Sequence, residues 1–290
     1  MNEKKLDRRR KYYMVLDCET ATLPCAADLP AEAKKNVAIA KPLIYDFGWT
    51  IVDAKGVVYR KRSFLITEIF SVPAIFNTAY YAWKRPIYLE RLANGETTLK
   101  SWAEATEIFM RDAAEAEALG AFNSMFDFKK AIPFTELYIS KLYSPDFYEW
   151  EAEQTTYCEY IANGRKPHNS KTFEPEIFRF RNNIYPLFDL WGLSCEHLLN
   201  NPEYKQTCID NGWSSASGKY FPTNAEKTFA FVTGQHDFEE AHTAIDDAEI
   251  ESYIFSLIAQ KTKRNFEMGI IYFPFRILGT VENFTGDYGM

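Results

Sequence analysis

The sequence contains no apolar run near the ~20 residues that a membrane-spanning helix needs, although 47% of its 290 residues are hydrophobic. It also lacks an N-terminal segment in which a basic start leads into an apolar stretch, as a secretory signal would have. The length and apolar content are sufficient for a large buried core. We therefore expect one decorated cytoplasmic domain that makes no contact with a membrane.

Cysteine is scarce, and the five cysteines form no CxxC pair. An odd, scattered set favours reduced thiols over a disulfide framework or a thiolate zinc site. A metal in this protein is therefore expected to bind through oxygen ligands. The five cysteines are Cys18, Cys25, Cys158, Cys195 and Cys208.

An excess of basic residues is also missing, since the net charge is −7. Proteins that coat nucleic acid depend on many Lys and Arg residues, so this composition argues against that class. An enzyme that holds a few nucleotides at a strand end needs only a local positive patch, and bound cations reverse the sign of an acidic site. The composition is therefore compatible with an enzyme that acts on nucleic-acid ends.

Short apolar runs and turn residues predict an α/β order along the chain. Residues 12–16 have the pattern of a central strand buried on both faces. Residues 43–52 and 57–66 flank a turn and predict an antiparallel hairpin. Further strands are predicted at 119–123 and 186–190, and helices at 101–118, 127–142, 193–199 and 244–260. Pro133 is expected to kink or interrupt the second helix, and the order as a whole indicates a mixed sheet.

Three stretches have the composition of insertions within a domain that spans residues 12–262. The expected insertions are 67–98, 143–185 and 201–222, with a basic arm at 1–11 and an extension at 263–290. The arm is interpreted as solvated, with phosphate binding as the alternative. The 143–185 insertion mixes basic and aromatic side chains, which suits either guidance of a single strand or a packed subdomain. The extension either packs back as a strand or contacts a partner.

Two carboxylates lie at the end of the first apolar run. Side chains alternate along a strand, so Asp17 and Glu19 project to the same side. Grouping two carboxylates beside a buried strand is costly unless a positive charge offsets their repulsion and lost hydration. A divalent cation would offset both. In the alternative interpretation, the pair faces water in a loop after the strand.

A third carboxylate, Asp127, follows another buried strand at the head of its helix. Steps of three or four residues align it with the apolar positions Ala131, Phe134 and Tyr138, which predicts an inward orientation. The alternative is a first-turn aspartate that only interacts favourably with the helix dipole. The inward phase makes Asp127 a candidate site residue.

The last predicted helix contains two adjacent aspartates that differ in helical phase. Asp247 falls on the apolar stripe, which consists of Ile250, Ile254, Leu257 and Ile258. Asp246 stands three residues after Thr243, the spacing of a capping box with Asp in place of Glu, and is assigned to capping. His242 then precedes the helix on a flexible segment, from which it can act as a base or remain a surface histidine.

Three segments together resemble the exonuclease motifs of the DEDDh superfamily of 3′→5′ exonucleases. They are DCET at 17–20, NSMFD at 123–127 and HTAIDD at 242–247. His242 stands five positions before Asp247, which is the spacing of the histidine branch of that superfamily. The resemblance covers most of the chain and implies a ribonuclease H-like α/β fold, in which a mixed sheet has helices on both faces.

The resemblance implies a hydrolase that releases nucleoside 5′-monophosphates from single-stranded nucleic-acid 3′ ends, with DNA slightly preferred over RNA. Asp17, Glu19 and Asp247 would bind one Mg²⁺ or Mn²⁺, and Asp17 and Asp127 would bind a second. His242 would act as the general base that helps to generate hydroxide for in-line attack.

The same resemblance implies four substrate contacts: Thr20, Leu23, Asn123 and Phe126. The sequence departs from the family pattern at Thr22, where a glycine is usual, and in the 120 residues that separate Asp127 from Asp247. The alternative function is a catalytically weak accessory or binding module of a polymerase or another nucleic-acid assembly. A protein partner is open in either case.

Overall fold

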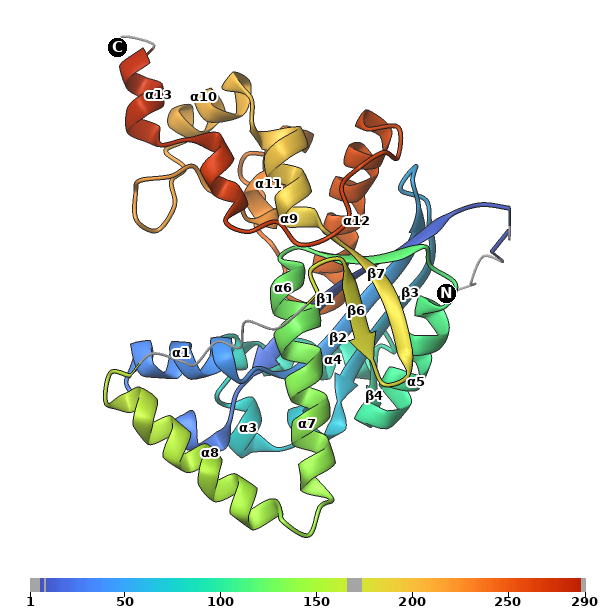
Figure 1. Cartoon of the computed structure of the whole chain (residues 1–290), viewed down its shortest axis with the longest axis vertical. Coiled ribbons are helices and arrows are strands. Elements are labelled where there is room, and N and C mark those ends of the chain that lie inside the picture. The colour runs from blue at the N-terminus through green and yellow to red at the C-terminus, as the bar shows by residue number, and fades with distance from the viewer. Residues whose placement is uncertain (1–5, 8, 166–173, 288–290) are drawn as a thin grey trace.

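A computed structural model describes residues 6–7, 9–165 and 174–287, and within them the chain folds around a seven-stranded sheet (Figure 1). The strands lie in the order β4-β3-β2-β1-β5-β7-β6 and include parallel and antiparallel neighbours. Their bounds are β1 (Tyr12–Ala21), β2 (Leu43–Asp53), β3 (Val58–Ile66), β4 (Thr98–Lys100), β5 (Ala118–Ala121), β6 (Ile177–Phe180) and β7 (Asn183–Asp189). The mixed sheet confirms the predicted α/β fold class.

The central strand β1 is longer than expected. It was predicted to end at Leu16, but it continues through Ala21, with a bulge between Glu19 and Thr20. Pairing with β2 along its whole length extends it, because backbone hydrogen bonds outweigh the poor strand propensity of the two acidic residues. Asp17 therefore lies on the strand itself and not in a loop after it.

Helices cover both faces of the sheet, and the alternation of β1 side chains divides the core between them. Tyr12, Met14 and Leu16 pack in the larger core, which includes α5 (Trp102–Ala113) and α7 (Ile132–Leu142). Tyr13 and Val15 pack on the opposite face against α12 (Ala244–Lys261). The predicted hairpin is also confirmed, since β2 and β3 pair antiparallel.

The helix after β5 is interrupted as Pro133 predicts. It begins with a short turn, α6 (Ser124–Phe126), and continues as the π-helical turn η3 (Asp127–Ala131) before α7. The N–H of Ile132 donates to the carbonyl of Asp127, five residues back, and Pro133 lies in the first turn of α7. A π-turn has one residue more than an α-turn, and such turns occur frequently at functional sites.

The first two expected insertions contain helices that lie beside the sheet. Residues 67–98 include α2 (Thr67–Phe70), α3 (Pro73–Phe76), η2 (Ala82–Lys84) and α4 (Arg85–Ala93). The 143–185 insertion contains α8 (Phe147–Ala162), whereas its basic residues Lys166 and Lys171 lie outside the described residues.

A disulfide joins Cys25, in η1 (Pro24–Ala26) after β1, to Cys158 in α8. The expectation of five reduced thiols was therefore wrong for this pair, whereas Cys18, Cys195 and Cys208 are free and buried. The two Cα atoms lie 6.3 Å apart, although 133 positions separate the residues in sequence. Sequence spacing does not report a contact of this kind, because it depends on how the insertion folds back over the end of β1.

The C-terminal third of the chain forms a helical group at one end of the sheet (Figure 1). It contains α9 (Leu190–Ser194), η4 (Cys195–Leu199), α10 (Pro202–Asp210), α11 (Ala225–Thr233), η5 (Pro274–Leu278) and α13 (Val281–Asp287). The extension from residue 263 packs back on the chain, because Gly269 bridges to Phe188 and Leu278 is buried beside Tyr204. None of the helices described is both long enough and apolar enough to cross a membrane.

The basic arm is only partly described. Lys4, Lys5 and Arg8 lie outside the described residues, whereas Arg9, Arg10 and Lys11 lead directly into β1.

Candidate active site

Glycine at position 48 brings α12 onto the sheet next to the acidic residues of β1. Gly48 on β2 is the register partner of Asp17. A Cβ atom on Gly48 would lie 2.6 Å from the backbone carbon of Ala244 and 2.6 Å from the nitrogen of Ile245. The first turn of α12 therefore rests directly on β2, which places Asp247 beside β1.

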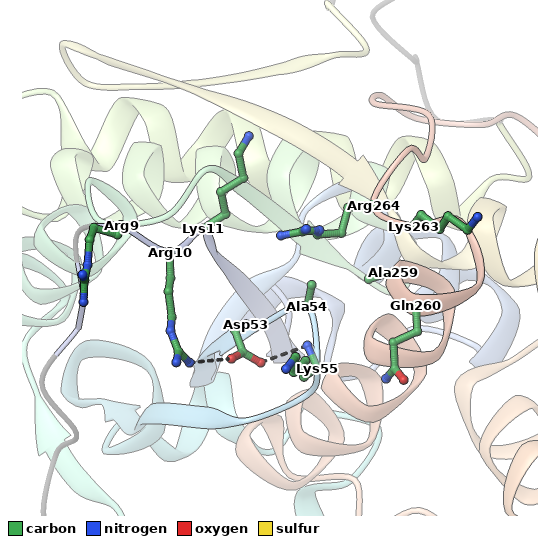
Figure 2. Close-up of a pocket in the computed structure, with 10 residues that line it drawn as sticks. All are labelled: Arg9, Arg10, Lys11, Asp53, Ala54, Lys55, Ala259, Gln260, Lys263 and Arg264. Carbon is green, nitrogen blue, oxygen red and sulfur yellow. Dashed lines mark hydrogen bonds and ion pairs between the residues drawn. The ribbon is translucent and has the colours of Figure 1, made fainter.

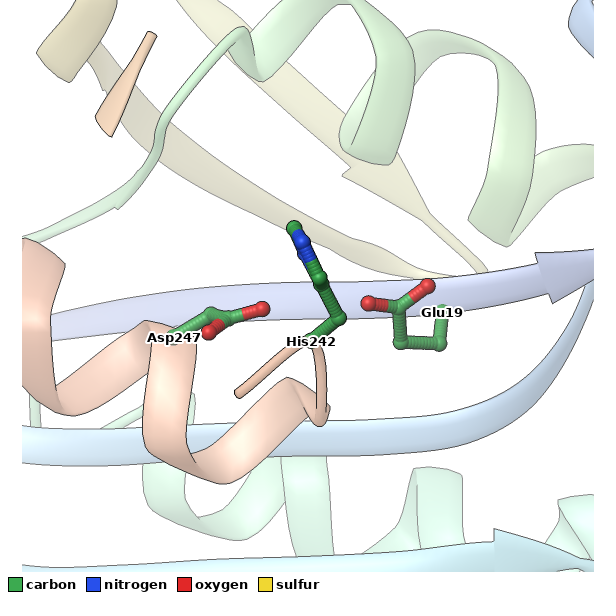
Figure 3. Close-up of side chains that lie close together, drawn as sticks. All are labelled: Glu19, His242 and Asp247. Atoms are coloured by element: carbon green, nitrogen blue, oxygen red, sulfur yellow. The ribbon is translucent and has the colours of Figure 1, made fainter. Parts of the chain in front are cut away.

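Three predicted site residues converge at this place (Figure 3). One ligand atom from each of Glu19, His242 and Asp247 lies within 4.8 Å of the others. Asp247 is only 7% exposed, and its Oδ1 atom is buried without a hydrogen-bond partner. A buried carboxylate oxygen without a partner is costly, so this atom is placed to receive a ligand.

Asp17 interacts electrostatically with this group, and Asp127 interacts with Asp17. Asp127 is almost fully buried, as its inward helical phase predicts, and burial and the charge of Asp17 raise its pKa well above the ordinary value. Asp17 in turn contributes to the raised pKa values of Glu19 and Asp247. Asp17 thus interacts with each of the other three carboxylates.

The charges at this site are poorly compensated within the described protein. Burial, followed by the charges of Glu240 and Asp46, raises the pKa of Asp17 to about 7. Burial and the charge of Asp17 raise the pKa of Asp247 to about 9. Burial also raises the pKa of Glu19 well above its ordinary value, and Lys84 offsets this only in part. Such a cluster is stable in its ionised form only if cations neutralise it.

His242 is held on the segment before α12 in a left-handed backbone conformation, with φ 49°. Its ring stacks on Tyr81 at a centroid distance of 4.4 Å, and its Nδ1 atom lies 3.7 Å from Glu240. The side chain is 29% exposed. Burial and the charge of Lys84 lower its pKa, so that the imidazole is neutral, and able to accept a proton, near neutral pH.

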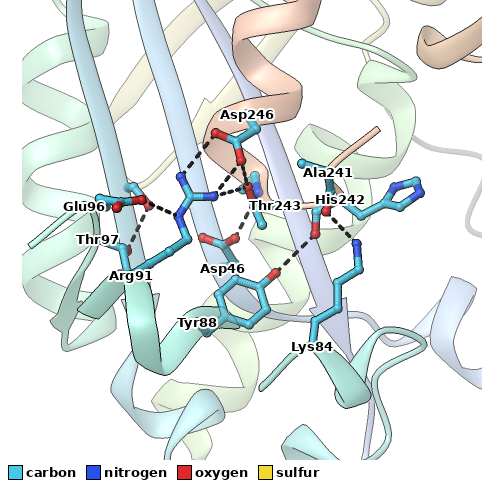
Figure 4. A network of polar contacts seen from close by, with 12 residues as sticks. Asp46, Lys84, Tyr88, Arg91, Glu96, Thr97, Ala241, His242, Thr243 and Asp246 are labelled. Atoms are coloured by element: carbon cyan, nitrogen blue, oxygen red, sulfur yellow. Dashed lines mark hydrogen bonds and ion pairs between the residues drawn. The ribbon is translucent and has the colours of Figure 1, made fainter. Parts of the chain in front are cut away.

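Residues of the 67–98 insertion anchor the His242 segment (Figure 4). Lys84 Nζ donates to the carbonyl of Ala241 at 2.5 Å, and the Tyr88 hydroxyl donates to the carbonyl of His242 at 3.4 Å. Arg91 donates to the Thr243 hydroxyl at 2.8 Å. The insertion therefore helps to position the histidine.

The expected capping role of Asp246 was wrong, although Thr243 is the N-cap residue of α12 as predicted. Asp246 accepts from the side chains of Thr243 and Arg91, at 2.7 and 2.6 Å. The N–H of Ala244 instead donates to the carboxylate of Asp46 on β2, at 2.9 Å. The Asp246 carboxylate bonds Arg91 and not the helix backbone because the arginine offers it an ion pair. Asp46 reaches the helix end because β2 and α12 pack closely at Gly48.

The four expected substrate contacts occupy different environments around the site. Thr20 is half-buried at the bulge of β1, and Phe126 is half-buried against the core. Asn123 is exposed in a left-handed conformation with φ 74°. Leu23 is only 1% exposed and lines a cavity of about 380 Å³ whose other walls include Trp150 of α8.

Three acidic residues near the site were not identified from the sequence. Glu226 and Glu240 form a second group with His242, again with ligand atoms within 4.8 Å of one another. Glu251, which is 2% exposed, was also missed, although it stands four residues after Asp247 and so shares its inward face. Helical phase would have found Glu251, but no local pattern indicates Glu226.

The site is chemically suited to divalent cations. Its donors are carboxylate oxygens and one imidazole, a set that favours hard cations such as Mg²⁺ or Mn²⁺ over metals that prefer thiolates. The Asp247 Oδ1 atom without a partner supports the same assignment.

A solved nuclease structure is similar to this chain. No protein-family model matches the sequence, and no curated protein matches it. The crystal structure of cell-death related nuclease 4 (CRN-4) matches with a TM-score of 0.39 and 10% sequence identity. The match covers 87% of this chain and 64% of that chain, so this chain spans less than two thirds of the length of that protein.

Proposed function

We propose that the protein is a metal-dependent 3′→5′ exonuclease that releases nucleoside 5′-monophosphates from single-stranded nucleic acid. The observation that carries the proposal is the convergence of Glu19, His242 and Asp247, with Asp17 in range of them and Asp127 in range of Asp17. These five residues come from β1, the π-turn η3, the segment before α12 and the first turn of α12. They supply the carboxylates and the base that phosphodiester hydrolysis with divalent cations requires.

The carboxylates would hold the cations and the histidine would transfer the proton. Asp17, Glu19 and Asp247 would hold one divalent cation, and Asp17 and Asp127 a second. When bound, these cations would neutralise the charge on the phosphate and favour deprotonation of water. His242 is suited to accept that proton because its pKa is lowered and its ring is partly exposed to solvent, where the proton can leave.

The remaining parts of the site would position the strand end. Thr20 and Asn123 lie at the ends of the strands that carry the motifs, and we propose that they contact the terminal nucleotide. Phe126 would pack against the terminal base from its half-buried position. Leu23 would contact the terminal base from the wall of the cavity that it lines together with residues of α8.

A labelled oligonucleotide tests the proposal directly. A single strand carrying a 5′ label is incubated with the protein and Mg²⁺ or Mn²⁺, and we expect a ladder that shortens from the 3′ end. EDTA and Asp17→Ala should each abolish the ladder. An intact oligonucleotide with every metal tried, or equal activity in Asp17→Ala, would refute catalysis and favour the binding-module alternative.

His242→Ala separates the base from the metal ligands. We expect a loss of rate of roughly a hundredfold or more, from the usual size of general-base effects. Stabilisation of the protein by Mg²⁺ should remain, because four carboxylates are retained. Unchanged turnover would refute the role of His242 as the base. Matched DNA and RNA strands in the same assay measure the preference for the sugar, for which we propose a slight preference for DNA.

A further inference from the structure

A basic cavity lies at the opposite end of α12 from the candidate active site (Figure 2). It has a volume of about 590 Å³ and is formed by the chain before β1, the β2–β3 turn and the chain around the end of α12. Six basic residues line it, with Asp53 as the acidic residue among the lining: Arg9, Arg10, Lys11, Lys55, Lys263 and Arg264. Three separate segments thus concentrate positive charge in a chain whose net charge is −7.

Half of these cations are already paired, and half are available. Arg9 pairs with Asp7, Arg10 lies 3.6 Å from Asp53, and Lys11 lies 2.9 Å from Glu117. Within the part of the chain that the structure describes, Lys55, Lys263 and Arg264 have no carboxylate partner. All three are exposed, and Arg264 points across the cavity toward the Arg9–Lys11 segment (Figure 2).

The backbone at the third segment also suggests a function. Lys263 and Arg264 are consecutive residues with φ of 53° and 66°. A left-handed conformation costs about 1–2 kcal/mol in residues with a Cβ atom, and glycine is the usual choice there. The sequence instead retains two long cationic side chains at these positions, and unfavourable conformations of this kind tend to occur at functional sites.

The geometry points to phosphates as the ligand, and we propose that the cavity binds the backbone of the same strand whose 3′ end occupies the active site. This inference depends on the proposed exonuclease function. From Asp247 to Lys263 the chain follows α12, which at 1.5 Å per residue spans about 24 Å. A stacked strand rises about 3.4 Å per nucleotide, so the cavity would meet phosphates roughly seven nucleotides from the 3′ end.

This second contact explains how an acidic enzyme holds a polyanion. The candidate active site carries a cluster of carboxylates, and without cations it would repel the substrate backbone. A remote group of three unpaired cations attracts the strand without neutralising the metal-binding carboxylates. The cavity therefore favours long substrates over short ones.

The test compares binding of a 4-nucleotide and a 20-nucleotide single strand, with Ca²⁺ replacing Mg²⁺ to slow cleavage. The variant is Lys55→Gln/Lys263→Gln/Arg264→Gln. Its matched control is Lys35→Gln/Arg111→Gln/Lys219→Gln, which removes the same charge from exposed positions elsewhere. We expect the cavity variant to lose about tenfold or more in affinity for the 20-mer. The slope of log affinity against log salt concentration should become shallower by about 2, at ~0.7 for each lost phosphate contact.

Both variants should bind and, with Mg²⁺, cleave the 4-mer as the wild type does. Equal affinity of wild type and cavity variant for the 20-mer, or equal losses for both lengths, would overturn the inference. If labelled poly-glutamate binds the wild type but not the cavity variant, while the 20-mer binds both proteins equally, the cavity binds an acidic protein and the inference is wrong. If the wild type cleaves neither length, the proposed function itself fails.

Discussion

Removing the charge of Asp17 should stabilise the metal-free protein while destroying metal binding. In the metal-free fold the pKa of Asp17 is raised from 3.8 to about 7, first by burial and then by Glu240 and Asp46. A carboxyl with a raised pKa binds its proton more tightly in the folded than in the unfolded chain. The folded state therefore loses stability as the pH rises from about 3.8 to about 7, and the full cost is present above pH 7.

The size of this cost follows from the shift. At 1.36 kcal/mol per pKa unit, a shift of this size corresponds to about 4 kcal/mol, and neighbouring carboxylates that take up protons reduce it to roughly 2–4 kcal/mol. Asn has the shape of Asp without its charge. Asp17→Asn in EDTA at pH 8 should therefore unfold at a higher temperature than the wild type, by roughly 1.5–2 °C per kcal/mol for a chain of 290 residues.

The assay is thermal or urea unfolding in EDTA and in 10 mM Mg²⁺, at pH 4 and at pH 8. At pH 4 the two proteins should be nearly equally stable, because the carboxyl is then protonated in the folded state. At pH 8 Mg²⁺ should stabilise the wild type and have little effect on the variant. Asp28→Asn, at an exposed position, is the control for the substitution itself. A destabilised Asp17→Asn protein in EDTA at pH 8, or equal Mg²⁺ effects in both proteins, would refute the reasoning.

Three further predictions concern the scaffold of the site. Gly48→Ala places a Cβ atom 2.6 Å from the backbone of α12. We therefore expect urea unfolding to show a destabilisation of about 1–3 kcal/mol, together with a loss of nuclease activity. Unchanged activity would contradict the role of this contact. Lys84→Met removes a charge that lowers the pKa of His242, so the acid limb of the pH–rate profile should move to higher pH, whereas Lys84→Arg should leave it in place. Thiol titration of the oxidised, denatured protein should find three thiols, rising to five after reduction, and five before reduction would exclude the Cys25–Cys158 disulfide.

The sequence was sufficient to predict features that depend on local periodicity. The β2–β3 hairpin, the helix from Ala244 and the inward positions of Asp127 and Asp247 all follow from patterns of two or 3.6 residues. The mixed sheet follows from the order of those elements. The length of β1 did not follow, because pairing with β2 extends it through residues that are poor strand formers.

Long-range contacts could not be predicted in this way. Asp46 replaces Asp246 as the partner of the helix N-terminus because Gly48 allows β2 and α12 to touch, and no local pattern reports that approach. Lys84 and Arg91 reach the His242 segment from an insertion that local sequence showed only as a loop-rich stretch. The basic cavity combines residues more than 200 positions apart, so the sequence revealed only the first of its three segments.

The π-turn at Asp127 also affects how this chain should be aligned with others. An α-helix advances about 100° per residue, so one extra residue in a regular helix would turn everything after it by that angle, whereas the wider π-turn takes up the extra residue and keeps the following helix in phase. A relative with an ordinary α-turn at this place would need a one-residue gap between Asp127 and Ile132, and an ungapped alignment would match every residue of α7 to the wrong neighbour. Deleting one residue from 128–131 would close the π-turn to an α-turn and leave α7 in phase with Asp127. A change of one residue in length is therefore easier to absorb at this turn than in a regular part of the helix.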